Sequence, residues 1–265
     1  MDKLMDGAIS KKKVLSSLVW KYLERGGVQG ISFVVSIILA RMLSPNDYGT
    51  IALILVFINV SNVFIQNGFN MALIQRKDVD DVDYSSVLYF SLAVAAALYT
   101  TLFFAAPLVG QFYGKNEIVN VLRVLSVTLF FGAFNSIQNA VIARKFLFKK
   151  LFMNSLGAVL GSGFIGIIMA YAGFGVWALV GQQLANSFLM CIIMFFTVRW
   201  RPKLVFSITR IKRLFSFGSK ILASSLIDVG YVEMYNLVIG KTFSAQMLGY
   251  RSEERRVGKE CRSRW

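Results

Sequence analysis

The stretch LFMNSLGAVLGSGFIGIIMAYAGFGVWALVGQQLANSFLMCIIMFFT spans residues 151–197 and decides the fold. It consists of two continuously apolar blocks, 151–172 and 176–197, which Gly173-Phe174-Gly175 joins in a very tight hairpin. Each block has about 20 residues and, at about 1.5 Å per residue, is long enough to cross a hydrocarbon core of about 30 Å. Strands of a membrane barrel would be shorter and would alternate in polarity, so the stretch predicts two antiparallel membrane helices.

Five further apolar blocks lie outside this stretch, at residues 16–40, 49–70, 85–110, 119–142 and 214–238. The chain has 265 residues, of which 56% are hydrophobic and 16% charged, and its mean hydropathy is +0.59. A soluble domain would carry about 25% charged and about 45–50% apolar residues. The sequence therefore predicts an all-α integral membrane protein. It excludes a soluble single-core enzyme, a disordered chain and a disulfide-stapled secreted domain.

The residue types that carry most catalytic and metal chemistry are scarce. The sequence contains no histidine, and its two cysteines, Cys191 and Cys261, lie far apart without metal-ligand spacing. The acidic run at residues 78–83 lacks the glycine and the terminal glutamate of a calcium loop, so we interpret it as a solvated turn and helix cap. We expect no catalytic residue, no metal and no cofactor.

Both ends of the chain differ from the apolar blocks. Residues 1–15 are polar and basic, as in a signal peptide, but Lys21, Glu24 and Arg25 interrupt the apolar stretch that follows. We therefore interpret 1–15 as a cytoplasmic segment before an uncleaved membrane helix. Residues 251–265, RSEERRVGKECRSRW, resemble an in-frame translation of a sequencing-adapter oligonucleotide and are treated as non-native, the alternative being a genuine basic tail.

The net charge of +15 is distributed unevenly between alternate loops. Most Lys and Arg residues lie in the N-terminal segment and in the loops after the second, fourth and sixth spans. The intervening loops contain Arg41, Lys115, Arg123 and Lys241. Because positive residues stay on the cytoplasmic side, we interpret the charge as a topology signal rather than a nucleic-acid site and place the N-terminus in the cytoplasm. The loops on the far side are too short to hold a catalytic domain.

Charged residues are costly inside a membrane helix, so they tend to face a bundle interior or a wet cavity. One face of the first predicted helix carries Lys21, Glu24, Arg25, Ser32 and Ser36, with Gln29 at its margin. In one interpretation Lys21 and Arg25 extend to the lipid headgroups, with Glu24 as their partner. In the other they form a cationic patch in an aqueous cavity that binds an anionic phosphate group.

Polar stripes recur on three further helices. At helical spacing they comprise Asn59, Asn62, Gln66 and Asn70; Thr128, Asn135, Gln138 and Asn139; and Ser224, Asp228, Tyr231 and Tyr235. A single amide is best explained as a hydrogen bond between helices. Four helices with polar stripes, however, favour a hydrated central pathway whose amides could bind sugar hydroxyls. Asp228, an acidic residue well inside a span, is a candidate for proton or cation coupling.

Four strings of sequence are similar to those of a known family. They are Leu39–Gly49 (LARMLSPNDYG), Gly68–Gln75 (GFNMALIQ), Phe146–Leu151 (FLFKKL) and Gly173–Val180 (GFGVWALV). In this order they resemble the polysaccharide-exporter branch of the multidrug/oligosaccharidyl-lipid/polysaccharide (MOP) flippase superfamily, which includes Wzx-type O-antigen and exopolysaccharide flippases. The resemblance runs from about residue 10 to about residue 250.

The resemblance implies two six-helix lobes around a central cavity. This chain would supply the first lobe (16–198), a basic cytoplasmic loop (199–213) and the start of the second lobe (214–250). It implies a truncated, multi-pass transporter of the bacterial inner membrane that moves undecaprenyl-diphosphate-linked oligosaccharides by alternating access. Its implied partners are that substrate, the lipid bilayer, and glycan polymerase or assembly proteins. Lys21 and Arg25 best fit the diphosphate-binding role, although they lie outside the four strings.

Three other functions stay open from the residues alone. A multidrug exporter would need an acidic, aromatic cavity, whereas the charges nearest this cavity are mainly Lys21 and Arg25. A membrane enzyme such as a glycan polymerase or ligase would need a large extracytoplasmic loop, which this sequence lacks. An interaction or regulatory fragment, or a non-functional truncation product, would expose the face that lines the cavity to lipid.

Overall fold

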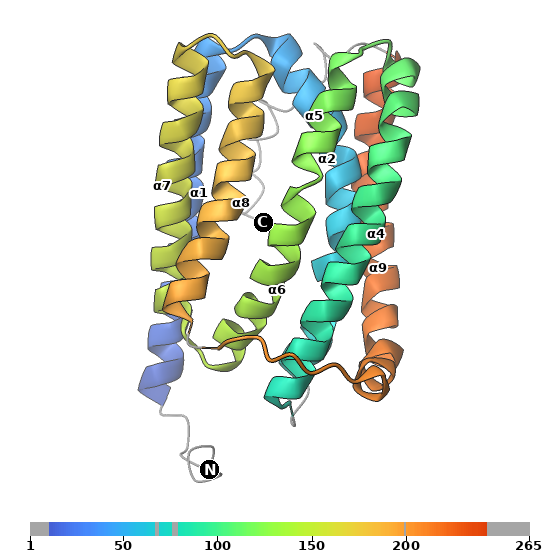
Figure 1. The fold of residues 1–265 in the computed structure, drawn as a ribbon. Helices are drawn as coiled ribbons and strands as arrows, with labels where there is room; N and C mark the ends of the chain where they lie inside the picture. The colour runs from blue at the N-terminus through green and yellow to red at the C-terminus, as the bar shows by residue number, and fades with distance from the viewer. Residues whose placement is uncertain (1–10, 67–68, 76–78, 199, 243–265) are drawn as a thin grey trace.

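The computed structural model describes residues 11–66, 69–75, 79–198 and 200–242, and every regular element in these ranges is a helix. The helices are α1 (Lys11–Met42), α2 (Pro45–Gln66), α3 (Phe69–Gln75), α4 (Asp81–Tyr113), α5 (Glu117–Leu125), α6 (Thr128–Arg144), α7 (Phe148–Tyr171), α8 (Val176–Thr197) and α9 (Ile208–Thr242). They run side by side in one elongated bundle (Figure 1). The predicted non-native segment 251–265, with Cys261, lies outside the described residues.

Six helical segments are long and apolar enough to cross a membrane, which confirms the predicted fold class. They are Val19–Met42, Pro45–Gln75, Asp81–Tyr113, Glu117–Arg144, Phe148–Tyr171 and Val176–Thr197. Within the described residues α9 is not one of the six, because Lys220, Asp228 and Glu233 lower its hydropathy. The helix predicted at 214–238 nevertheless forms as part of α9.

The fourth predicted span, 119–142, is two helices rather than one. α5 ends at Leu125 and α6 begins at Thr128. At this junction the Ser126 hydroxyl donates to the Leu122 carbonyl (2.7 Å), and the Thr128 hydroxyl donates to the Leu125 carbonyl (2.6 Å). Such hydroxyl bonds to the preceding turn compete with the helical ladder and bend the chain. The second predicted span, 49–70, similarly falls within α2 and α3.

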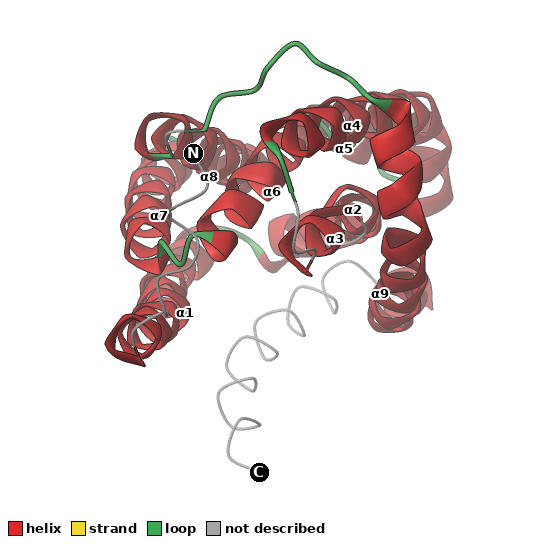
Figure 2. Ribbon diagram, turned by 90° about the horizontal axis from the view of Figure 1, so that it is seen from below, coloured by secondary structure: helices red, strands yellow, loops and turns green. Residues whose placement is uncertain are grey.

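Glycines allow α7 to pack closely against both α1 and α8. A Cβ atom at Gly163 would lie 2.8 Å from Cγ2 of Val35 on α1. On the side facing α8, a Cβ atom would lie 2.8 Å from Leu189 at Gly161 and 2.9 Å from Gln182 at Gly166. Small residues at such contacts let membrane helices approach closely. The three helices α1, α7 and α8 therefore form one group, and Figure 2 shows α6 between this group and α4.

One end of the bundle, which we call the basic end, contains the start of α1 and the connections α6–α7 and α8–α9 (Figure 1). Its cations lie on aromatic rings: Lys21 Nζ is 5.4 Å from the ring centre of Phe148, and Lys149 Nζ is 5.3 Å from that of Trp20. Arg144 also donates a hydrogen bond of 2.8 Å to the Leu73 carbonyl. Basic and aromatic side chains of this kind are typical of the membrane–water interface.

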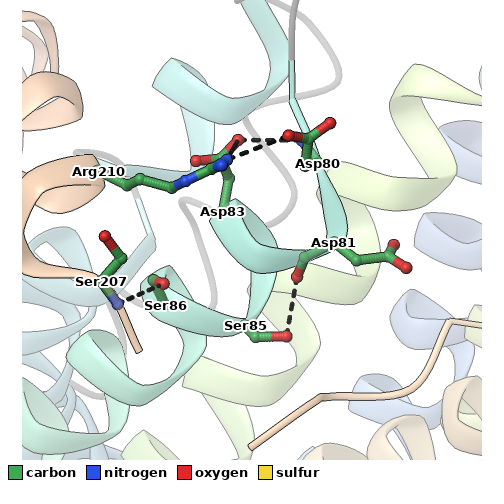
Figure 3. Close-up of polar contacts among 7 residues, drawn as sticks. All are labelled: Asp80, Asp81, Asp83, Ser85, Ser86, Ser207 and Arg210. Atoms are coloured by element: carbon green, nitrogen blue, oxygen red, sulfur yellow. Dashed lines mark hydrogen bonds and ion pairs between the residues drawn. The ribbon is translucent and has the colours of Figure 1, made fainter. Parts of the chain in front are cut away.

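The segment between α8 and α9 crosses the start of α4 and is held there by polar contacts that we call the linker clasp. Its residues are Asp80, Asp81, Asp83, Ser85 and Ser86 on the α4 side, and Lys203, Ser207 and Arg210 on the other. Figure 3 shows the Arg210 guanidinium reaching Asp83 (3.0 Å) and Asp80 (3.2 Å), and the Ser207 N–H donating to the Ser86 hydroxyl (3.0 Å).

The acidic run at the start of α4 serves as both a cap and an ion-pair partner. The carboxylate of Asp83 accepts a hydrogen bond from the backbone N–H of Asp80 (2.9 Å), as expected for a helix cap, and its side chain is only 7% exposed. The hydrogen bond to Asp83, followed by that to Asp80, raises the pKa of Arg210 above its ordinary value. A base with a raised pKa loses its interaction only in strong alkali, so the clasp keeps its cation at every physiological pH.

We expect Arg210→Ala to release the clasp without unfolding the bundle. Without the guanidinium, the backbone N–H groups of Lys203 and Ser207, which donate to Ser85 and Ser86, should open to solvent more often. Hydrogen–deuterium exchange of a peptide covering residues 200–208 should accelerate about tenfold. The exposed Lys212 nearby gives the control, because Lys212→Ala should leave exchange unchanged. Equal exchange in wild type and Arg210→Ala would show that the clasp does not hold the segment.

Candidate functional site

The bundle contains two adjoining cavities whose walls combine amide and hydroxyl side chains with apolar ones. The first, of about 290 Å³, lies between α1, α2, α7 and α8, and the second, of about 250 Å³, lies between α2, α6 and α8. Both are lined by Gln183, Asn186 and Ser187 of α8, so they meet at this helix. We call the two cavities together the amide cleft. None of the residues that line it is Asp, Glu, Lys or Arg.

Helical spacing aligns the side chains that line the cleft. The first cavity is also lined by Gln29, Ser32 and Ser36 of α1, Ser162 of α7 and Gln182 of α8. The second is also lined by Asn59, Asn62 and Gln66 of α2, and by Thr128, Asn135, Ser136 and Asn139 of α6. Residues three, four and seven positions apart share a helix face, so each helix presents a polar stripe to the same space.

A glycine opens the space between the stripes of α2 and α6. A Cβ atom at Gly132 would lie 3.2 Å from Oδ1 of Asn62 and 3.6 Å from Nε2 of Gln66. These two side chains are themselves hydrogen-bonded, since the Gln66 amide donates to Asn62 Oδ1 (3.3 Å). Any larger residue at 132 would crowd the amides that the second cavity presents.

Three buried acceptors of α6 that line the cleft have no hydrogen-bond partner among the described residues. They are Oδ1 of Asn135, the hydroxyl of Ser136 and Oδ1 of Asn139. The other end of the Asn135 amide is anchored, because its Nδ2 donates to the Ser187 carbonyl at 3.2 Å. A buried polar atom without a partner is costly, so these groups are suited to receive hydrogen bonds from a ligand or from water.

A buried carboxylate that was not predicted from the sequence lies beside the cleft. Glu233 of α9 is 8% exposed, and its Oε1 accepts a hydrogen bond of 3.0 Å from Nδ2 of Asn59. Its presence inside the predicted span 214–238 was the available signal, because an ionisable residue in such a span tends to face the bundle interior. Asp228, the residue selected instead, is exposed on α9, about 140° around the helix from Glu233.

Six of the eight predicted cavity residues line the cleft, whereas Glu24 and Gln138 line neither cavity. Gln29, Asn59, Asn62, Gln66, Asn135 and Asn139 are in its walls. Gln138 is fully buried and lines neither cavity. It lies about 100° around α6 from Asn139, so it belongs to the adjacent, packed side of the helix. Its amide has no partner among the described residues.

The predicted cationic patch lies towards the basic end and not in either cavity. Lys21 contacts the ring of Phe148, an environment typical of the interface. Glu24 is half-buried and Arg25 is exposed. Arg25 precedes Gln29 by about one turn, or about 6 Å along α1, and so lies on the side of the helix that lines the first cavity. Lys21 thus contacts an aromatic ring of α7, and Arg25 lies along α1 between Lys21 and the first cavity.

Comparisons with known proteins agree on one family. The family described as polysaccharide biosynthesis proteins matches residues 38–258. The succinoglycan biosynthesis transport protein ExoT of Rhizobium meliloti (strain 1021) is 28% identical over 81% of this chain and 44% of its own length. The teichuronic acid biosynthesis protein TuaB of Bacillus subtilis (strain 168) is 23% identical over 90% of this chain and 50% of its own length.

The lipopolysaccharide biosynthesis protein WzxC of Escherichia coli (strain K12) is 21% identical over 90% of this chain and 49% of its own length. The chain therefore spans about half the length of the curated relatives it matches. Among solved structures, an inward-facing multidrug resistance MATE family transporter of the MOP superfamily is similar, with a TM-score of 0.62 and 17% identity over 88% of this chain and 58% of that one. At this identity the likeness shows the fold alone.

The family match covers well over half of the chain, and the bundle of apolar helices has the fold of a MOP-superfamily transporter. The chain therefore belongs to the polysaccharide biosynthesis protein family, a family of multi-pass membrane proteins of the polysaccharide flippase type.

Proposed function

We propose that this chain is the first lobe of a flippase that moves an undecaprenyl-diphosphate-linked oligosaccharide across the bacterial inner membrane. The amide cleft is the observation that carries the proposal, because it provides polar partners deep inside a bundle of membrane helices. No bond is made or broken in this function. The membrane-spanning helices act by holding a hydrated path that opens alternately to each side.

The physical difficulty of the task explains the composition of the cleft. A sugar headgroup loses its hydrogen bonds to water when it leaves the interface, at a cost of several kcal/mol for each unsatisfied group in hydrocarbon. Amide and hydroxyl side chains replace these bonds, while the lipid tail stays in the bilayer. Because the partners are neutral and numerous, the headgroup can exchange one for another and need not be trapped at a single charged site.

The distribution of charge supports an orientation in which the basic end faces the cytoplasm. Arg144, Lys149 and Arg201 are at this end, and positive residues near membrane helices stay on the cytoplasmic side. In this orientation Lys21 and Arg25 stand at the cytoplasmic entrance, where the diphosphate arrives. The segment 199–213 is then a cytoplasmic loop, and 214–250 begins the second lobe.

A multidrug exporter of the same superfamily is less well supported by the cleft. A cavity for cationic drugs needs carboxylates or aromatic faces to attract them. The residues that line the cleft include no carboxylate, and the neighbouring Glu233 is engaged by Asn59. The aromatic residues in its lining are Phe33 and Tyr48, both in the first cavity, whereas the second cavity has none. The fold likeness to a multidrug transporter does not alter this balance, because that likeness concerns the fold alone.

We expect the complete transporter that contains this lobe to restore surface polysaccharide in a bacterial strain whose own polysaccharide exporter is deleted. The measurement is the amount of surface polysaccharide, with accumulation of the lipid-linked intermediate in the inner membrane as a second readout. Ethidium efflux in the same strain tests the drug-exporter alternative. Restored efflux without restored polysaccharide would contradict the proposal.

A further inference from the structure

We propose that the amide cleft is a saccharide subsite selective for an uncharged sugar, such as a hexose or an N-acetylhexosamine, over a uronic acid. The inference rests on the proposed function and specifies the substrate class of the same site. Its observations are the unpartnered acceptors on α6, the neutral lining and the position of Glu233.

The polar groups of the cleft match those of a neutral sugar. Each sugar hydroxyl has one O–H donor and two acceptor lone pairs, and each Asn or Gln side chain offers one carbonyl acceptor and two N–H donors. Oδ1 of Asn135, Oδ1 of Asn139 and the Ser136 hydroxyl are buried acceptors without a partner in the part of the chain that the structure describes. Hydroxyl donors of a sugar would satisfy all three.

The acceptor of Asn135 is oriented before any ligand arrives. Its Nδ2 must be the atom that faces the Ser187 carbonyl, since a carbonyl only accepts hydrogen bonds. The opposite amide atom, Oδ1, is then directed away from α8 and stays unpaired. Asn139 follows one turn later on the same face, so the two acceptors form a row along α6. A preorganised acceptor row favours a ligand that offers several O–H donors.

The electrostatics disfavour a sugar that carries a negative charge. A carboxylate in a protein interior is stabilised by cationic or clustered donors, and the residues that line the two cavities include no Lys or Arg. The nearest buried charge that the structure describes is the carboxylate of Glu233, 3.0 Å from Nδ2 of Asn59. A uronic acid at this site would lose the hydration of its carboxylate and find no cationic side chain in the lining to replace it. A neutral sugar avoids this cost.

The size of the cleft fits this assignment. Its two parts have volumes of about 290 Å³ and about 250 Å³ and meet along α8. Sites for small ligands occupy about 300–1,000 Å³. The cleft can therefore hold one or two sugar rings next to this lobe.

The experiment measures binding of three lipids to the 265-residue chain in lipid nanodiscs by native mass spectrometry. The lipids are undecaprenyl diphosphate, the same lipid carrying N-acetylglucosamine, and the same lipid carrying glucuronic acid. We expect the neutral glycolipid to bind about tenfold more tightly than the bare lipid, as one or two additional hydrogen bonds would give. The glucuronic acid lipid should gain nothing over the bare lipid.

Three variants locate the effect. Asn139→Leu should remove the tenfold gain for the neutral glycolipid and leave binding of the bare lipid unchanged. Gln138→Leu is the matched control on the adjacent, fully buried position outside the cleft, and it should keep the gain. Asn135→Ser provides a second, smaller change in the cleft. The unfolding midpoint of each variant separates loss of binding from loss of folding.

The outcomes distinguish this inference from the proposed function. Equal gains for the neutral and the acidic glycolipid, or no gain for either above the bare lipid, would overturn the subsite and leave the diphosphate-linked substrate standing. Failure of all three lipids to bind would overturn the proposed function and this inference together. A neutral gain that survives Asn139→Leu and Asn135→Ser would place sugar recognition elsewhere and also overturn the subsite.

Discussion

The Gly163→Leu variant is expected to lose about 3 kcal/mol of unfolding free energy and to separate α1 from α7. A Cβ atom at Gly163 would already lie 2.8 Å from Cγ2 of Val35, closer than real Cβ contacts allow, and 3.2 Å from its Cγ1. Val35 is itself buried, so it cannot rotate into open space. Because the first cavity has walls from both helices, including Ser32 and Ser162, the same change should distort the cleft.

Thermal unfolding of the purified chain in detergent, followed by circular dichroism, measures this loss. Gly30→Leu is the matched control, because nothing lies within 4 Å of the Cβ position at Gly30 of α1. Trimming the opposing side chain gives a second test: Val35→Ala should recover part of the stability of Gly163→Leu, although it costs stability on its own. If Gly163→Leu and Gly30→Leu unfold at the same temperature, close packing of α1 on α7 does not hold the bundle together.

The fold was largely predictable because hydropathy is a local property. In a membrane, a block of about 20 apolar residues can satisfy its backbone hydrogen bonds only as a helix, whatever the helix packs against. The tight turn at 173–175 also forms as expected, with positive φ at Gly173 and Gly175. The break between α5 and α6 was not predicted, because it depends on which carbonyl the hydroxyls of Ser126 and Thr128 find. Hydropathy averages over such single bonds.

From the sequence, the site could be predicted only where its residues share one face of a single helix. Asn135 and Asn139 lie one turn apart, so any rotation of α6 that brings one to the cleft brings the other. Gln138 lies at the margin of that stripe, and its position depended on the rotation that neighbouring helices impose. The place of Glu233 was even harder to predict from the sequence, because its partner Asn59 is 174 positions away along the chain. No local pattern joins these two residues.

The Arg25→Ala variant is expected to weaken binding of undecaprenyl diphosphate to this chain at least about tenfold. An arginine fork binds phosphate oxygens through two hydrogen bonds, each charge-assisted and worth more than a neutral one. Arg25 is exposed and lies about one turn from Gln29, so it is free to meet a headgroup that enters the first cavity. Lys21→Ala should have a smaller effect, because its ammonium already lies on the ring of Phe148.

Lipid comparison separates a specific site from general attraction to the membrane surface. Binding is measured by native mass spectrometry in nanodiscs, with phosphatidylglycerol as the reference anionic lipid and Arg41→Ala, an exposed cation at the opposite end of α1, as the control. A specific site predicts that Arg25→Ala affects the diphosphate lipid far more than phosphatidylglycerol, and that Arg25→Lys recovers binding only in part, since lysine keeps the charge but not the fork. Equal weakening for both lipids would mean that Arg25 attracts anionic headgroups in general, and that the diphosphate is bound elsewhere. In the complete transporter the same variant should reduce surface polysaccharide while its amount in the membrane stays unchanged, because an exposed side chain contributes little to folding.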